Sequence, residues 1–198
     1  MKSKLSLSLV TALGLAAFSS FTHASHDFGD KHTSIKLLAG ANLYEDVHVT
    51  ETNQTSQDVA LATYGVGIEY DLTRTFGVEL RHYFGGEEKN ISYEVGDTNV
   101  NSNVSMDAAT ALLLNIQSPS FYGASAYLQG GPSIVKSSLN NVGVSNTSFA
   151  YGAGLEYIVG KNSFVSLDAL IFNEFDATDQ SKKSIKNKII TLGFALKF

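Results

Sequence analysis

The last eleven residues of the chain, 188–198, have the sequence KIITLGFALKF, and they give the clearest indication of the fold. Apolar residues occupy every second position from Ile190 to Phe198, with small or polar residues at most of the positions between them. Successive side chains of a strand point to opposite faces, so this period of two predicts a β-strand with one continuous apolar face. Only Lys188, at the start of the stretch, interrupts that face.

The same alternation recurs seven times towards the N-terminus. It predicts strands at residues 34–43, 59–72, 76–84, 104–117, 121–131, 148–159 and 163–172. The connections are short at 71–75, 118–120 and 160–162, and long and polar at 44–58, 85–103, 132–147 and 173–187. Eight strands joined by connections of alternating length predict an all-β fold, an eight-stranded antiparallel up-and-down barrel with its short turns at one end.

The N-terminal segment differs from the rest of the chain. Lys2 and Lys4 precede an apolar run at 5–21, and Ala24 follows as a small residue at a cleavage point, so residues 1–24 predict a secretory signal peptide. Residues 25–198 then form one barrel domain. Without the two lysines the formal net charge falls from −5 to −7, which argues against nucleic-acid binding. No later stretch has the roughly 18 apolar residues of a spanning helix.

Alternation alone leaves two possibilities for the apolar face. It faces lipid in an outer-membrane barrel, or it faces inward in a secreted lipocalin-like barrel. Aromatic residues with the apolar parity lie at the short-turn ends of the strands, where they predict an aromatic girdle at the membrane interface: Tyr70, Phe76, Tyr122, Tyr157 and Phe198. The sequence therefore favours the lipid-facing barrel, and it predicts a location in the outer membrane of a Gram-negative cell envelope.

The opposite face mixes glycines with charged residues. Together with Lys36, it predicts a lumen ionic network formed by Glu69, Glu79, Arg81, Asp107, Glu156 and Asp168. An eight-stranded interior is just wide enough for side chains, so we interpret this network as a structural plug. The alternative is a narrow or gated channel. Because carboxylates exceed the bases Lys36, Arg81 and Lys197, such a channel would prefer cations.

The closing strand also carries a resemblance to a known family. Residues 64–81 and the C-terminal strand resemble the eight-stranded outer-membrane barrels typified by the OmpA transmembrane domain, OmpX and Ail. This resemblance implies a porin-like transmembrane β-barrel. It also implies that the barrel-assembly machinery reads a signal formed by Ile190, Leu192, Phe194, Leu196 and Phe198.

The sequence predicts no catalytic site, cofactor or metal site. His82 has the outward parity but shares its strand face with no serine, and the histidines and aspartates of residues 26–32 lie in a polar leader. The segments 44–58 and 85–103 carry formal charges of −4 and −3, which disfavours polyanionic ligands. We therefore expect a monomer in outer-membrane lipid that acts through its loops on an extracellular surface ligand, or in membrane integrity.

Overall fold

The computed structural model describes residues 32–45, 59–85, 88–95, 98–139, 142–176 and 184–198. The strands are β1 (Thr33–Glu45), β2 (Val59–Asp71), β3 (Phe76–Phe84), β4 (Glu88–Val95), β5 (Thr98–Gln117), β6 (Ala124–Leu139), β7 (Val142–Ile158), β8 (Ser163–Asp176) and β9 (Ser184–Lys197). The described part of the chain contains no helix that is long and apolar enough to cross a membrane. The proposed signal peptide, 1–24, lies outside the described residues.

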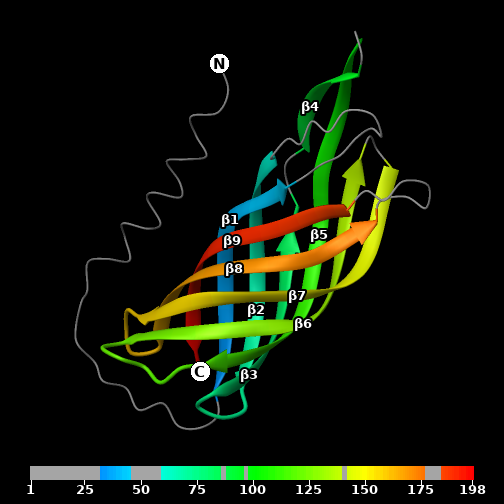
Figure 1. Cartoon of the computed structure of the whole chain (residues 1–198). Coiled ribbons are helices and arrows are strands. Elements are labelled where there is room, and N and C mark those ends of the chain that lie inside the picture. Colours follow the sequence, from blue (N-terminus) through cyan, green and yellow to red (C-terminus); the bar gives the residue numbers. More distant parts are fainter. Residues whose placement is uncertain (1–31, 46–58, 86–87, 96–97, 140–141, 177–183) are drawn as a thin grey trace.

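The strands form a closed antiparallel barrel (Figure 1). Each strand pairs with its neighbours in the order β3-β2-β1-β9-β8-β7-β6-β5, and the pairing of β3 with β5 closes the wall. The short strand β4 follows β3 and pairs with the far end of β5, so β3 and β4 occupy one position in the wall. The predicted eight-stranded up-and-down barrel is therefore confirmed.

The strands are strongly tilted to the barrel axis. Leu72 follows directly after β2 and opposes Phe76 across a short turn. From there the cross-strand partners run through Ile116, Leu128, Ala153, Ala169, Ile190 and Ala41 to Ala62. This path around the wall returns to β2 ten residues from its starting point at Leu72. A stagger of this size corresponds to a tilt of roughly 35–45° and to an interior filled by side chains.

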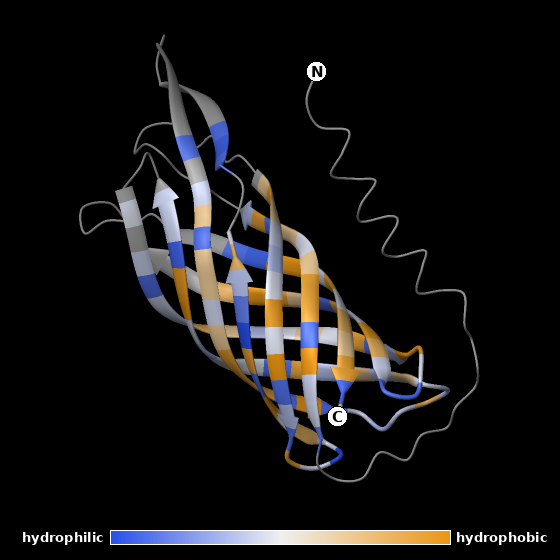
Figure 2. Cartoon of the chain, turned by 180° about the vertical axis from the view of Figure 1, so that it is seen from behind, coloured by the Kyte–Doolittle hydropathy of each residue, from blue (hydrophilic) through white to orange (hydrophobic). Residues whose placement is uncertain are grey.

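Burial alternates along the strands in the sense expected of a membrane barrel. On β2, Tyr64, Val66 and Ile68 are exposed on the outer face, whereas the residues between them are buried inside. Orange apolar bands consequently alternate with pale or blue ones along the wall in Figure 2. A lipocalin-like barrel would have the opposite arrangement, with its apolar side chains inside.

Two of the predicted long loops are largely strand. Residues 85–103 form most of the β4–β5 hairpin, and residues 132–147 form the outer part of the β6–β7 hairpin. The backbone ladder continues there, since Ile91, Tyr93 and Val95 have register partners on β5. At the opposite end, β6 begins at Ala124 rather than at Phe121.

Candidate functional site

The centre of the barrel interior holds an arginine and a carboxylate two residues apart on β3. Glu79 and Arg81 both point inward, and neither has any exposed surface. The Arg81 guanidinium donates from Nε to Glu79 Oε1 at 2.7 Å and from Nη2 to Glu79 Oε2 at 2.9 Å. This bidentate contact matches the planar guanidinium to the carboxylate, and it compensates two charges that have lost their hydration.

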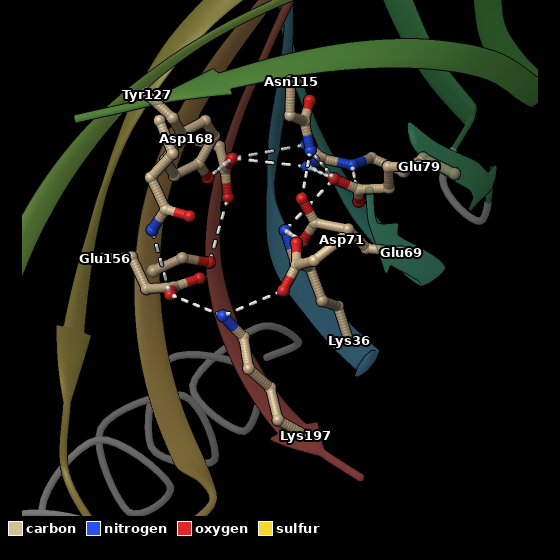
Figure 3. A network of polar contacts seen from close by, with 12 residues as sticks. Lys36, Glu69, Asp71, Glu79, Asn115, Tyr127, Glu156, Asp168 and Lys197 are labelled. Atoms are coloured by element: carbon tan, nitrogen blue, oxygen red, sulfur yellow. Dashed lines mark hydrogen bonds and ion pairs between the residues drawn. The ribbon is translucent and has the colours of Figure 1, made fainter. Parts of the chain in front are cut away.

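Side chains from β1, β2 and β5 extend this pair into a network (Figure 3). Glu69 and Glu79 are directly opposite in the β2–β3 ladder, so two like charges face each other. The Lys36 Nζ atom lies 2.8 Å from Glu69 Oε2 and 3.1 Å from Glu79 Oε2. The Asn115 amide donates to Glu69 Oε1 at 2.6 Å and to Glu79 Oε2 at 3.0 Å. The ammonium and the amide thus offset the repulsion between the carboxylates.

Asp168 of β8 connects the network to the opposite wall. Its Oδ1 atom lies 3.4 Å from an Arg81 nitrogen and accepts a hydrogen bond from the Tyr127 hydroxyl of β6. The Ser166 hydroxyl donates to Asp168 Oδ2 at 3.1 Å. Arg81 also donates to the Tyr83 hydroxyl at 3.1 Å. The Arg81 guanidinium therefore links β3 with β8 through the barrel interior.

Inward glycines make room for these long side chains. Gly154 of β7 lies between Tyr127 and Asp168 in the register, and the Tyr127 ring occupies the space of a Cβ atom at Gly154. At Gly67 of β2, the Glu79 carboxylate takes the corresponding space. The mixture of glycine with charged residues on this face is thus a packing requirement, because a long side chain crosses each of these two glycines.

A second group of charges lies at the short-turn ends of the strands. The Lys197 Nζ atom is 3.5 Å from Asp71 Oδ2 and 3.7 Å from Glu156 Oε1, and it lies 4.4 Å from the centre of the Phe164 ring. The Gln117 amide donates to Glu156 at 3.5 Å. We call these residues the mouth group. Its contacts are longer than those at the centre of the network, and its lysine retains some solvent exposure.

Towards the long-loop end the interior is largely apolar. The buried cluster there includes Leu38, Tyr44, Leu61, Tyr83, Met106, Leu113, Val135, Leu170, Phe172 and Ile189. We call these residues the apolar layer. Polar side chains are buried among them as well: the Tyr44 and Ser137 hydroxyls bond at 3.2 Å, whereas both amide atoms of Asn187 have no hydrogen-bond partner within the described residues. The charged network thus lies beneath a packed, mainly apolar layer that also contains buried amides and hydroxyls.

The structure brings together most of the predicted lumen residues, but not all. Glu69, Glu79, Arg81 and Asp168 meet in the central network, and Glu156 belongs to the mouth group. Asp107 was assigned to the lumen incorrectly. A register shift between Met106 and Ala108 turns it outward, where its carboxylate accepts hydrogen bonds from Ser105 and Ser138.

Sequence reasoning missed several members of the network. Asn115, Tyr127 and Tyr83 supply hydrogen bonds to its charged groups, and Asp71 was assigned to a turn. The signal that could have found Asn115 and Tyr127 is their inward parity on strands that were otherwise identified correctly.

Four residues of the predicted girdle are outward side chains near the short-turn ends of the wall: Tyr70, Phe76, Tyr157 and Phe198. Tyr122 lies instead in the β5–β6 turn, where it and Gly123 have φ values of 51° and 81°. A two-residue hairpin turn of this type needs positive φ at both central positions, and this requirement ends the strand. The exposed Tyr122 ring packs edge-on against Phe121 at 4.4 Å.

A second set of outward aromatic residues lies nearer the long-loop end and was not predicted: Tyr64, Phe84, Phe149 and Tyr151. The two sets bracket the apolar outer face, as expected for a band about 25 Å tall. The residues of the C-terminal pattern also point outward: Ile190, Leu192, Phe194, Leu196 and Phe198. Strand β9 pairs with β1, so the last and the first strands of the chain are neighbours in the wall. The role of β9 as an assembly signal stays a prediction.

His82 lies on the outer face with a partner that the sequence did not identify. Its Nδ1 atom is 2.8 Å from the Thr110 hydroxyl of β5, and its ring meets Phe84 edge-on at 4.7 Å. The hydrogen bond satisfies a polar pair on a lipid-facing surface. Among the described residues, no group of three acidic, histidine or cysteine side chains could hold a metal ion. The remaining leader residues, 26–31, lie outside them.

Comparison with known proteins found similarity in both sequence and structure. The outer membrane protein beta-barrel domain matches residues 8–198. No curated protein matches the chain. The structure is similar to the outer membrane protein OprG from Pseudomonas aeruginosa, with a TM-score of 0.60 and 14% identity over 86% of this chain and 98% of that one.

Two further solved structures have the same fold. Neisserial surface protein A has a TM-score of 0.55 and 11% identity, over 84% of this chain and 97% of that one. Ail, the attachment invasion locus protein of Yersinia pestis, was solved in complex with the heparin analogue sucrose octasulfate. Its TM-score is 0.54 and its identity 15%, over 85% of this chain and 99% of that one.

Proposed function

This chain belongs to the outer membrane protein β-barrel family, and from that premise we propose that its extracellular hairpins carry its function. In our proposal it is a monomeric, non-catalytic surface protein that is exported by the 1–24 signal peptide and inserted by the barrel-assembly machinery. Surface interaction or adhesion is its main role, and support of membrane integrity is the alternative.

The observation that carries this proposal is the length of the hairpins. A tilted strand needs about 9–11 residues to cross an outer membrane. Strand β5 has 20 residues, and β6 and β7 have 16 and 17. The β4–β5 and β6–β7 hairpins therefore continue beyond the closed barrel as a sheet rich in polar residues. A recognition surface on such a rigid scaffold costs little ordering entropy on binding.

One edge of this sheet suits an extended partner segment. Within the described residues, β7 pairs with β8 only from Ala150 onwards, so positions 142–149 have a ladder partner on the β6 side alone. This edge, VGVSNTSF, contains no charge and no proline, whereas the edge strand β4 carries Glu88, Lys89 and Glu94. Charges and prolines normally protect exposed edges from strand addition. We therefore propose that the ligand adds a strand at β7.

The charge of the loops argues against one class of ligand. Ail was solved with a sulfated heparin analogue, whereas segments 44–58 and 85–103 of this chain are acidic. Like charge would repel such a polyanion. The ligand that we propose is consequently a neutral or basic polypeptide segment on another surface.

The test compares full-length protein with a barrel in which residues 89–102 and 138–145 are replaced by short turns. Heat-modifiability on gels checks that the shortened barrel still folds. We expect the shortened barrel to lose binding to host cells, or the bacteria that carry it to survive less well in serum. Ser145→Lys with Thr147→Lys should also lower binding, while Ser120→Lys in a short turn should not. Equal binding and survival by all variants would contradict the proposal.

The second candidate function is a narrow cation-preferring channel. It is favoured by the excess of interior carboxylates, Glu69, Asp71, Glu79, Glu156 and Asp168, over Lys36, Arg81 and Lys197. The filled interior opposes it, since the buried side chains of the apolar layer leave little open space for a hydrated ion. Planar-bilayer recordings on purified protein decide between the two. Steady cation-selective currents that change with Arg81→Met would support the channel.

A further inference from the structure

The outer surface of the barrel carries an apolar groove across strands β5 to β9. Its volume is about 650 Å³, and it is a shallow depression that is open along most of its length. Ile116 lies at one end and Ile190 at the other, with Leu128, Leu155 and Leu167 along its sides. All five side chains belong to the exposed apolar band, so the groove opens towards the membrane.

Three outward alanines create this groove. Ala153 and Ala169 are cross-strand partners, and they lie between Leu128 and Ile190 in one row around the wall. Ala126 begins the neighbouring row, which continues through Leu155 and Leu167. Because an alanine side chain ends at Cβ, the surface is lowered between the larger residues. Interior residues Tyr127, Gly154 and Asp168 also line the groove, so it lies directly behind their contact.

The groove has one polar end. Ser118, in the turn between β5 and β6, lines it beside Gln117. The Gln117 backbone nitrogen donates to the Thr75 carbonyl at 2.8 Å, which holds Thr75 of the β2–β3 turn next to this end. From there the lining is almost wholly apolar as far as Ile190. Polarity therefore changes from the membrane interface towards the membrane interior, as it does along a phospholipid.

We propose that this groove binds one acyl chain of a glycerophospholipid from the periplasmic leaflet. The groove is continuous with the lipid-facing surface, and short turns of outer-membrane barrels face the periplasm. Its path from β5 to β9 crosses four inter-strand spacings, about 19 Å, roughly the reach of a long acyl chain. The phosphate then lies at the polar end of the groove, beside Ser118 and the β2–β3 turn. This site does not involve the extracellular hairpins and is independent of their function.

The test uses the full chain in vesicles of phosphatidylcholine and phosphatidylglycerol that contain a phosphatidylglycerol with a photoreactive group on its acyl chain. After irradiation, mass spectrometry maps the crosslinked peptides. We expect crosslinks to concentrate on β6, β7 and β8 at the alanines of the groove. Filling the groove with Ala153→Leu and Ala169→Leu should reduce them about tenfold, because each leucine displaces several methylenes of the bound chain.

The matched control is Ala39→Leu, an outward alanine of β1 outside the groove, which should leave the crosslinks unchanged. Heat-modifiability verifies that each variant is folded. Crosslinks distributed evenly around the barrel would overturn the proposal, as would filled variants that crosslink like the wild type. Dimers that form through the same peptides would also overturn it and would assign the groove to a second copy of the chain. The test uses no surface-binding assay, so its result is independent of the proposed function of the hairpins.

Discussion

The two halves of the barrel interior are filled by different chemistry. Towards the short turns, charged side chains from most of the strands meet in a network whose central contacts are 2.6–3.4 Å long. Towards the long loops, the apolar layer packs Leu61, Leu170 and Phe172 with few directional contacts. Apolar packing tolerates exchange between side chains of similar volume, whereas a buried charge needs its partners in place. We infer that the network fixes the register of the strands and that the apolar layer closes the barrel.

Breaking the network at its centre should reduce the stability of the barrel more than any other change proposed below. Arg81→Met leaves Glu79 and Asp168 buried without their shared cation, and it should lower the free energy of unfolding by about 3–5 kcal/mol. Urea titration of the protein in lipid vesicles measures this change. The double variant Arg81→Met with Glu79→Gln should recover part of the loss, because fewer charges then lack a partner. A single variant as stable as the wild type would contradict a structural role for the network.

A cavity in the apolar layer should have a smaller effect of a different kind. Leu170→Ala removes a fully buried side chain, which should cost about 3 kcal/mol in the same titration. Leu170→Met, which conserves the volume, should cost much less. If both variants lost equal stability, the layer would depend on specific contacts, and the contrast between the two halves would be wrong.

The difference between the halves also explains what could be predicted from the sequence. Alternation is a local property of each strand, so the barrel, its outward face and the inward parity of Glu79, Arg81 and Asp168 followed from it. The prediction for Asp107 was wrong because the direction of this side chain depends on a bulge in the pairing with β6, which parity alone does not reveal. The prediction that Tyr122 lies in a strand was wrong because the turn requires a positive φ there, which tyrosine seldom adopts.

Contacts across the barrel were beyond sequence reasoning. Which carboxylate Arg81 reaches depends on the stagger between strands, and that stagger is a property of the closed wall. The hairpins beyond the barrel were partly missed because polar serine and asparagine residues resemble loops in composition. Their strand pairing becomes visible only in the ladder, as for Ser92 opposite Asn101.

Overfilling the network region should cost less than emptying the apolar layer. Gly154→Ala places a Cβ atom where the Tyr127 ring lies, so the ring must shift away from Asp168. We expect a loss of about 2 kcal/mol in the free energy of unfolding. Gly143 of β7 has open space around its Cβ position, so Gly143→Ala is the matched control and should change little. Equal effects at both glycines would show that strand propensity, rather than packing against Tyr127, accounts for the loss.

The smallest effect is expected in the mouth group, where the network meets solvent. Lys197 lies 3.5 and 3.7 Å from Asp71 and Glu156, longer distances than those of the Glu79 and Arg81 pair, and Lys197→Gln should cost about 1 kcal/mol or less. The salt dependence of the stability loss distinguishes the two regions more sharply than the size of the loss does. Because ions screen partly exposed pairs but not buried ones, the Lys197→Gln loss should shrink when the unfolding titration is repeated at about 1 M salt. The loss in Arg81→Met should persist under the same conditions. A salt-sensitive Arg81 variant would mean that water and ions reach the centre of the network, and it would move the interpretation of the interior from a plug towards a channel.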